Sequence, residues 1–155
     1  MKYFCNPILV AILVFCFSSP VFSQNTTTKE IERLKKIAQE VTIIRDNWGI
    51  AHVYGKTDAD AVFGMLYAQC EDDFKRVEMN YIEKLGRLSE INGKSVLYND
   101  LEIKLLIDVE EAKADYKKAA PWLKKLLNSY ADGINFYLHN HPEVKPALLT
   151  RFEPW

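Results

Sequence analysis

Three side chains near the C-terminal end of the sequence are of types that bind zinc. His139, His141 and Glu143 lie close together, and imidazole and carboxylate groups are common zinc ligands. The two histidines, however, flank a predicted helix end next to Pro142, where the helix dipole and solvent alone favour histidine. A solvated helix end is the preferred interpretation, and these residues are not assigned to a metal.

The acidic run Glu71-Asp72-Asp73 and the histidine at position 52 are two further candidates. Calcium needs about six or more converging oxygen ligands, whereas adjacent helical residues point in different directions, so the run is interpreted as a solvated helix edge. His52 lies in a predicted strand, with no nucleophile that can be named beside it. A strand histidine hydrogen-bonded to a neighbour is therefore preferred over a general base.

Neither a thiol nor a hydroxyl group can be assigned a catalytic role from the sequence. The cysteines are Cys5, Cys16 and Cys70, and the first two lie in the leader described below. The remaining thiol cannot form an internal disulfide, and Cys70 is interpreted as a small buried hydrophobe rather than a reactive group. No Gly-x-Ser-x-Gly elbow occurs. The sequence thus assigns no catalytic, cofactor-binding or metal-binding residue to this chain.

Residues 1–23 have the layout of a cleavable secretory signal. A basic start precedes an apolar run from Ile8 to Phe17, and small residues follow up to Ser23. The run is about half of the roughly 20 apolar residues that cross a bilayer, so a stable membrane span is not favoured. A lipid anchor on Cys16 is a weaker alternative because the bulky Phe15 precedes it. We expect export to the periplasm or the cell exterior, with cleavage near Ser23.

Charge and length narrow the function classes further. Lys and Arg number 20 against 21 Asp and Glu, a formal charge of −1, which gives no electrostatic argument for nucleic acid or an anionic membrane surface. Residues 24–155 suffice for one small domain but are short for an enzyme with a deep cleft. The terminal Pro154-Trp155 pair has nothing after it to bury it, which predicts an incomplete chain.

Hydrophobic patterning predicts the elements in the first part of the mature chain. Residues 24–40 form a polar tether followed by a short amphipathic helix from Glu30. Two β-branched runs, Val41–Ile44 and Ile50–Tyr54, flank turn residues and predict a hairpin. A long or kinked helix follows from about Asp58 to Glu90, with Thr57 and Asp60 as its capping pair.

The later elements are predicted by the same argument. One or two irregular helices are expected between Leu101 and Lys118. A clean helical period predicts a helix from Pro121 to about Asn140. Gly64 and Gly86 interrupt the long helix, and because each costs about 1 kcal/mol relative to Ala, close packing against another element is expected to compensate.

Several segments, in order along residues 41–155, resemble motifs of the penicillin amidase family. The segments are Val41–Gly55, Ala61–Gln69, Leu85–Glu90, Tyr130–Asn135 and Phe152–Trp155. Two departures stand out: Ala51 replaces the proline of the commonest members, and Glu71-Asp72-Asp73-Phe74 replaces Asp-Arg-Leu-Phe. The second departure is more similar to the acyl-homoserine-lactone acylase branch.

The resemblance implies an N-terminal-nucleophile hydrolase made as an exported precursor that cuts itself into an α-chain and a β-chain. In this family a serine at the new β-chain N-terminus attacks the amide carbonyl, its own α-amine is the base, and backbone and Asn donors stabilise the oxyanion. These groups, the calcium ligand and the acyl-pocket residues all lie beyond position 155. The implied partners are the remainder of the precursor and a small amide substrate, such as a β-lactam amide or an N-acyl homoserine lactone.

The expected fold class is therefore α+β: a mostly helical N-terminal fragment of an αββα hydrolase with a short β-hairpin. Residues 41–155 form the incomplete N-terminal portion of the α-chain, and the hairpin is expected to add to the sheet of the core. Two alternatives stay open. One is a non-catalytic exported module that binds a partner through the Leu123–Leu138 face, and the other is a stand-alone pseudo-domain left by a premature stop.

The leader interpretation gives a first testable prediction. When the chain is expressed with its leader in a bacterial host, the exported product should begin at Gln24, because the cut is expected after the small residue Ser23. Intact-mass measurement and N-terminal sequencing check this. Ser23→Trp should retain the leader, and an exported product that still begins at Met1 would contradict the interpretation.

Overall fold

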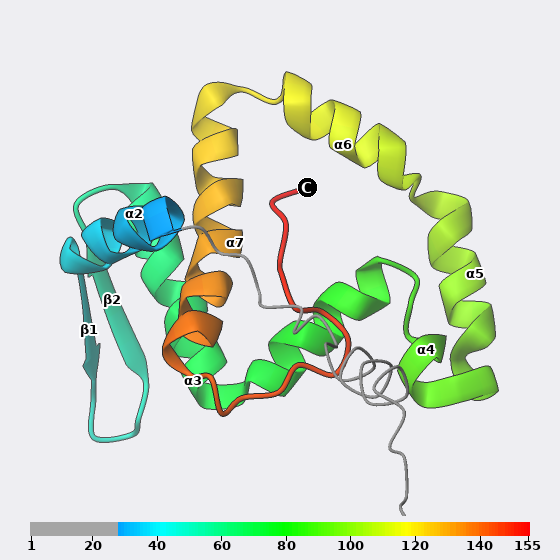
Figure 1. The fold of residues 1–155 in the computed structure, drawn as a ribbon, viewed down its shortest axis with the longest axis horizontal. Coiled ribbons are helices and arrows are strands. Elements are labelled where there is room, and N and C mark those ends of the chain that lie inside the picture. The colour runs from blue at the N-terminus through cyan, green and yellow to red at the C-terminus, as the bar shows by residue number, and fades with distance from the viewer. Residues whose placement is uncertain (1–27) are drawn as a thin grey trace, which may run out of the picture.

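The structure, a computed structural model, describes residues 28–155 and is mostly helical with one antiparallel hairpin (Figure 1), as the predicted fold class requires. The interpretations of residues 1–23 as a leader and 24–27 as a tether fall outside these residues. In chain order the elements are α2 (Thr28–Gln39), β1 (Val41–Arg45), β2 (Ala51–Gly55), α3 (Asp58–Lys84), α4 (Ser89–Asn92), the 3-10 helix η1 (Gly93–Val96), α5 (Leu97–Leu106), α6 (Val109–Lys118) and α7 (Pro121–Asn140).

The predicted hairpin is present, with Ile43 opposite Val53 and Arg45 opposite Ala51. Val41 and Val53 both face α3, where they pack against Gly64: a Cβ built on this glycine would lie 2.5 Å from Val41 Cγ1 and 2.7 Å from Val53 Cγ1. The close packing expected at Gly64 is therefore confirmed. Because α3 carries no side chain there, the hairpin can lie directly on the helix backbone.

Helices α3 and α7 form the core of the described residues. Their largest buried cluster includes Leu66, Phe74, Ile82 and Ile134, and it also holds Phe152 from the last segment of the chain. A smaller cluster of Leu34, Phe63 and Phe136 joins α2 to the same pair of helices. The helical period predicted from Pro121 is confirmed, since α7 runs from Pro121 to Asn140 and turns its apolar side toward α3.

The course of α3 differs from the prediction at its end. Thr57 and Asp60 form the predicted capping box, and the helix kinks at Asp73, whose φ is −161° and ψ 75°. The helix ends at Lys84, however, so a helix reaching Glu90 was wrong. Gly86 adopts a φ of +61°, with Arg87 N donating to Ile82 O at 3.0 Å and Gly86 N to Glu83 O at 2.9 Å. This is the hydrogen-bond pattern with which a left-handed glycine ends a helix.

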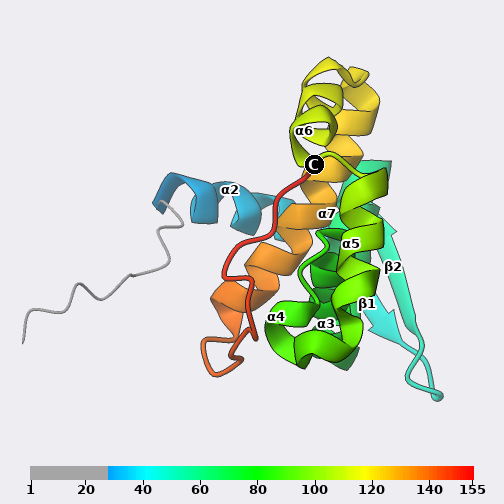
Figure 2. The same ribbon diagram turned by 90° about the vertical axis from the view of Figure 1, so that its right-hand side faces the viewer.

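Two regular helices occupy the region predicted to be irregular. Asp108 begins α6 by accepting hydrogen bonds from Glu110 N and Glu111 N at 2.7 and 3.0 Å. Helices α5 and α6 form an arch that leaves the end of α3 and returns to the start of α7, and the last residues of the chain run inside it (Figures 1 and 2). No helix within residues 28–155 is long and apolar enough to cross a membrane.

The contact between α3 and α7 gives a second prediction. A Cβ at Gly133 would collide with the carbonyl oxygen of Phe63 and lie 3.1 Å from Leu66 Cβ. Gly133→Ala should therefore lower the free energy of unfolding by about 1–3 kcal/mol, because a backbone atom of α3 cannot move aside cheaply. Urea unfolding measures it. Lys125→Ala, at an exposed position of α7, is the control, expected within about 0.5 kcal/mol of the parent. Equal stabilities for the two variants would refute the close approach.

Candidate functional site

The buried carboxylate of Glu78 fixes the segment that follows α7. Its side chain, 2% exposed, accepts hydrogen bonds from Ala147 N at 2.8 Å, Leu148 N at 2.8 Å and Leu149 N at 2.9 Å. A buried charge is tolerated only when it is paired or fully hydrogen-bonded, and these three backbone donors meet that requirement. Residues 141–155, called the strap below, are thus held across α3.

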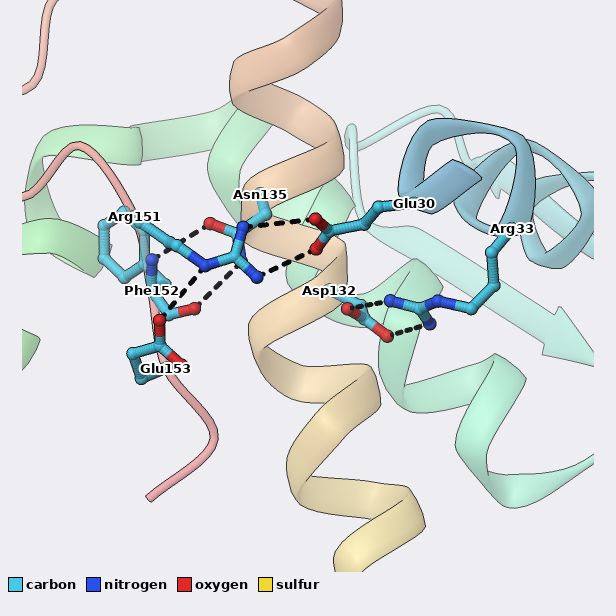
Figure 3. Close-up of polar contacts among 7 residues, drawn as sticks. All are labelled: Glu30, Arg33, Asp132, Asn135, Arg151, Phe152 and Glu153. Carbon is cyan, nitrogen blue, oxygen red and sulfur yellow. Dashed lines mark hydrogen bonds and ion pairs between the residues drawn. The ribbon is translucent and has the colours of Figure 1, made fainter. Parts of the chain in front are cut away.

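Asn135 fixes the strap a second time, near its end (Figure 3). Its side-chain Nδ2 donates to Phe152 O at 2.9 Å, and its Oδ1 accepts from Phe152 N at 2.9 Å. The Phe152 ring then inserts edge-on between aromatic rings, with centroids 4.9 Å from Tyr81 and 6.0 Å from Phe74. The Asn135 side-chain amide thus satisfies both backbone hydrogen-bonding groups of Phe152, as a neighbouring strand would in a sheet.

Ion pairs connect the strap, α7 and α2 (Figure 3). Arg33 forms a bidentate pair with Asp132, with N–O distances of 2.6 and 2.8 Å, and Arg151 contacts Glu30 at 2.9 Å and Glu153 at 3.0 Å. The hydrogen bond to Asp132 raises the pKa of Arg33, and the one to Glu30 raises the pKa of Arg151. A hollow of about 460 Å³ lies among these side chains. Since both guanidinium groups are already paired, the cluster serves as an anchor.

The zinc candidates do not converge. His141 Nδ1 lies 3.0 Å from Glu143 Oε1, and the His141 ring packs on Tyr137 with centroids 4.4 Å apart. His139 instead stacks beside Phe136. The backbone and then His141 lower the pKa of Glu143 by hydrogen bonding. Within residues 28–155 no three His, Cys, Asp or Glu side chains lie close enough together to hold a metal ion.

The acidic run on α3 holds the hairpin. Glu71 and Asp72 pair with Arg45 at 3.0 and 2.8 Å. Arg45 also donates to Gly49 O at 2.9 Å in the hairpin turn. Asp73 turns away and pairs with Arg76 at 3.2 Å. The interpretation as a helix edge is confirmed, and the structure adds that two of its carboxylates fix the turn.

His52 has the neighbour that the sequence analysis expected. Its Nε2 lies 3.4 Å from Asp46 Oδ2, and Asp46 also accepts hydrogen bonds from the backbone N–H groups of Trp48 and Ile50, each at 2.9 Å. Partial desolvation acts to raise the pKa of Asp46, but these hydrogen bonds outweigh it and lower the pKa overall. The pair therefore belongs to the hydrogen bonding of the turn.

Cys70 is 1% exposed and lies in the core cluster. Burial raises the pKa of its thiol to about 12, so the thiolate form is suppressed at neutral pH. The interpretation of Cys70 as a small buried hydrophobe is confirmed.

A second hollow, of about 380 Å³, opens inside the arch between α3, α6, α7 and the strap. Its walls are mostly apolar and include Leu85, Ile107, Leu127 and Trp155, and Lys113 Nζ sits 4.7 Å from the Trp155 ring centroid. Walls of this kind can hold an aliphatic or aromatic group.

The residues that hold this structure together were missed at the sequence level, although three of them left a signal. Glu78 stands four positions after Phe74 and four before Ile82, so it occupies the core-facing stripe of α3, where an acid is out of place. Asp132 and Asn135 lie within the segment Tyr130–Asn135, already singled out for its resemblance. Asp132 pairs with Arg33, 99 positions away, and Asn135 with Phe152, 17 positions away, and local patterning reveals neither pair.

Comparison with known proteins places these elements in a family. The sequence pattern of the penicillin amidase family matches residues 40–155. The chain belongs to the penicillin amidase family. It is 29% identical over 123 residues to the acyl-homoserine lactone acylase QuiP of Pseudomonas fluorescens, covering 79% of this chain and 15% of the relative. It is 26% identical over 122 residues to the penicillin acylase 2 proenzyme of a Pseudomonas species, covering 77% and 16%.

The fold is also that of a solved member. A thermostable penicillin G acylase from Alcaligenes faecalis superposes with a TM-score of 0.61 at 21% identity, over 74% of this chain and 64% of the solved chain. The segments that resemble family motifs, from Val41–Gly55 to Phe152–Trp155, all fall within the matched region. The chain spans only about 15% of the length of the curated relatives it matches.

The strap gives a third prediction. Glu78→Gln keeps the volume but removes the charge and turns an amide donor toward backbone N–H groups, so stability should fall by about 1.5–3 kcal/mol. Urea unfolding and hydrogen exchange of the amides of residues 147–149 measure it, and those amides should lose protection first. Glu32→Gln on the exposed side of α2 is the control, expected within about 0.5 kcal/mol. Unchanged exchange in residues 147–149 would show that Glu78 does not hold the strap.

Proposed function

We propose that this chain is the N-terminal part of the α-chain of an exported amide hydrolase, and that the serine which attacks the amide lies in a part of the precursor beyond this chain. The family match over residues 40–155 carries the proposal. The relatives are named as acylases: one as an acyl-homoserine lactone acylase and two as penicillin acylases. This chain would contribute scaffold to such an enzyme.

The chemistry of the described residues supports a scaffold role. The buried carboxylate of Glu78 binds backbone amides, and the guanidinium groups of Arg33 and Arg151 are paired with acids. Cys70 is buried in protonated form. A nucleophilic mechanism needs an activated nucleophile beside a base, and the polar groups described above are committed to holding the fold.

Chain lengths support a processed precursor. The matched stretch is 64% of the solved penicillin G acylase chain but only about 15% of the curated relatives, one of which is named as a proenzyme. A solved chain so much shorter than those relatives fits an α-chain cut from a precursor. The same comparison supports the remainder of the precursor as the main partner of this chain.

Two substrate classes fit the relatives: side-chain amides of β-lactams and N-acyl homoserine lactones. Both join an acyl group to an amine through a linear amide, so one mechanism serves both. In this proposal, the calcium ion that the family resemblance implies is bound by the part of the precursor beyond this chain.

The alternative of a module that binds through the Leu123–Leu138 face is not supported by the packing. Ile134, Tyr137 and Leu138 on that face are buried against α3 within the chain itself. A face already used for the core is not available to a partner without unfolding. The amide-hydrolase proposal is therefore the stronger one.

The fourth prediction tests the proposal on the complete gene product. Purified from the exported fraction, it should consist of two chains and hydrolyse at least one of two amides, penicillin G or an N-acyl homoserine lactone, measured by release of the free amine. Substitution of the β-chain N-terminal serine by alanine should abolish both self-cleavage and turnover, because one hydroxyl performs both reactions. A correctly cut product that turns over no amide would reject the proposal.

A further inference from the structure

One end of the hairpin carries the most exposed large apolar side chain of the described residues. Trp48 is 88% exposed, Ile50 60% and Met65 40%, and all three line a hollow of about 390 Å³ between the turn and α3. We call Trp48, Ile50 and Met65 the hairpin-end patch. In both views the turn projects beyond the helices (Figures 1 and 2). Large apolar side chains grouped around a hollow are typical of a binding surface.

The patch is held rigidly. Arg45 ties the turn to α3 through Gly49 O, Ala68 O and the two carboxylates of α3, and Asp46 accepts from the N–H groups of Trp48 and Ile50. The backbone that carries Trp48 and Ile50 is thus fixed before anything binds. Because the site is already formed, less conformational entropy is lost when a partner binds.

Charge defines one property of the partner. Around the patch, Glu71 and Asp72 pair with the guanidinium of Arg45, and Asp46 contacts His52. Three carboxylates thus stand beside one guanidinium, which leaves the rim predominantly acidic. A partner that places Lys or Arg at this rim would be favoured, and an acidic one disfavoured.

The strands indicate that the partner is polypeptide. Within residues 28–155 the sheet has two strands, so each strand has an outer edge that no third strand covers. Unpaired strand edges expose backbone donors and acceptors that another chain segment can satisfy, and proteins rarely leave them open beside exposed apolar side chains.

Chain length favours a polypeptide of the same precursor. The stretch matched here is only 15% of the length of a curated relative, so most of such a precursor lies outside this chain. We propose that the hairpin-end patch binds another segment of the same precursor, one that inserts an aliphatic or aromatic side chain into the hollow and places Lys or Arg at the acidic rim. This inference rests on the proposed function and deepens it, because it identifies where on this chain the rest of the enzyme docks.

The fifth prediction is a footprinting experiment on the complete gene product. Hydroxyl-radical oxidation of Trp48 and Met65 should be slower in the folded product than in urea by about tenfold or more, because a docked segment excludes solvent from the patch. In the chain as described here Trp48 is 88% exposed, so an open patch would give rates within about twofold of the unfolded protein. Equal rates would overturn the inference.

A pair of variants locates the effect. Trp48→Asp should reduce the yield of assembled product by about tenfold or more, whereas Asn47→Asp, which adds the same charge at the adjacent exposed residue outside the hollow, should stay within about twofold of the parent. Cys70 should remain unreactive to thiol reagents in both variants, which shows that the core of this chain is intact. Equal yields for the two variants would count against the patch.

The remaining outcomes are also decisive. Protection of Trp48 that increases with protein concentration would indicate a second copy as the occupant and overturn the inference, as would a gene product that ends with this chain. Amide turnover is measured on the same preparation. Turnover with an open patch rejects the docking site alone, and a protected patch in a correctly cut product without turnover of any amide rejects the proposed function alone.

Discussion

The buried carboxylate of Glu78 is the constraint on which the rest of the fold depends. An irregular segment can lie over a helical core only if its backbone N–H groups find acceptors, and Glu78 supplies them for three successive residues. With the strap fixed there, Phe152 reaches the aromatic rings between α3 and α7. Arg151 then reaches Glu30, so that α2, at the other end of the chain, is joined to the strap.

Local pattern was sufficient where an element is defined by its own residues. The period of α7, the β-branched runs of the hairpin and the capping pair at Thr57 all predicted what the structure contains. The end of α3 was mispredicted because Gly86 was interpreted as an interruption within a helix, whereas its positive φ ends the helix. The pairs that hold the fold, such as Arg33 with Asp132, join residues 99 positions apart, and no local pattern encodes them.

The site posed a different problem for prediction. Each candidate group that the sequence offered has a structural partner: His52 lies beside Asp46, His141 beside Glu143, and Glu71 beside Arg45. The structure disperses these groups over the fold, whereas catalysis or metal binding requires side chains that converge. Function therefore had to be inferred from family membership, which motif order along the chain revealed although no single motif was specific.

The three most exposed large apolar side chains of residues 28–155 lie on two surfaces, the hairpin end and α5, and rigidity distinguishes these surfaces. Helix α5 exposes Tyr98 and Leu105, at 83% and 85%, and its Asp100 accepts from Leu88 N and Ser89 N, in the segment that follows α3. The hairpin end, in contrast, is fixed to α3 by a guanidinium with four acceptors. A surface whose geometry is set in advance can select a partner, whereas an arch with few contacts can adjust to whatever packs on it. The hairpin end is for this reason the stronger candidate for the docking site, and α5 the surface more readily reshaped on assembly.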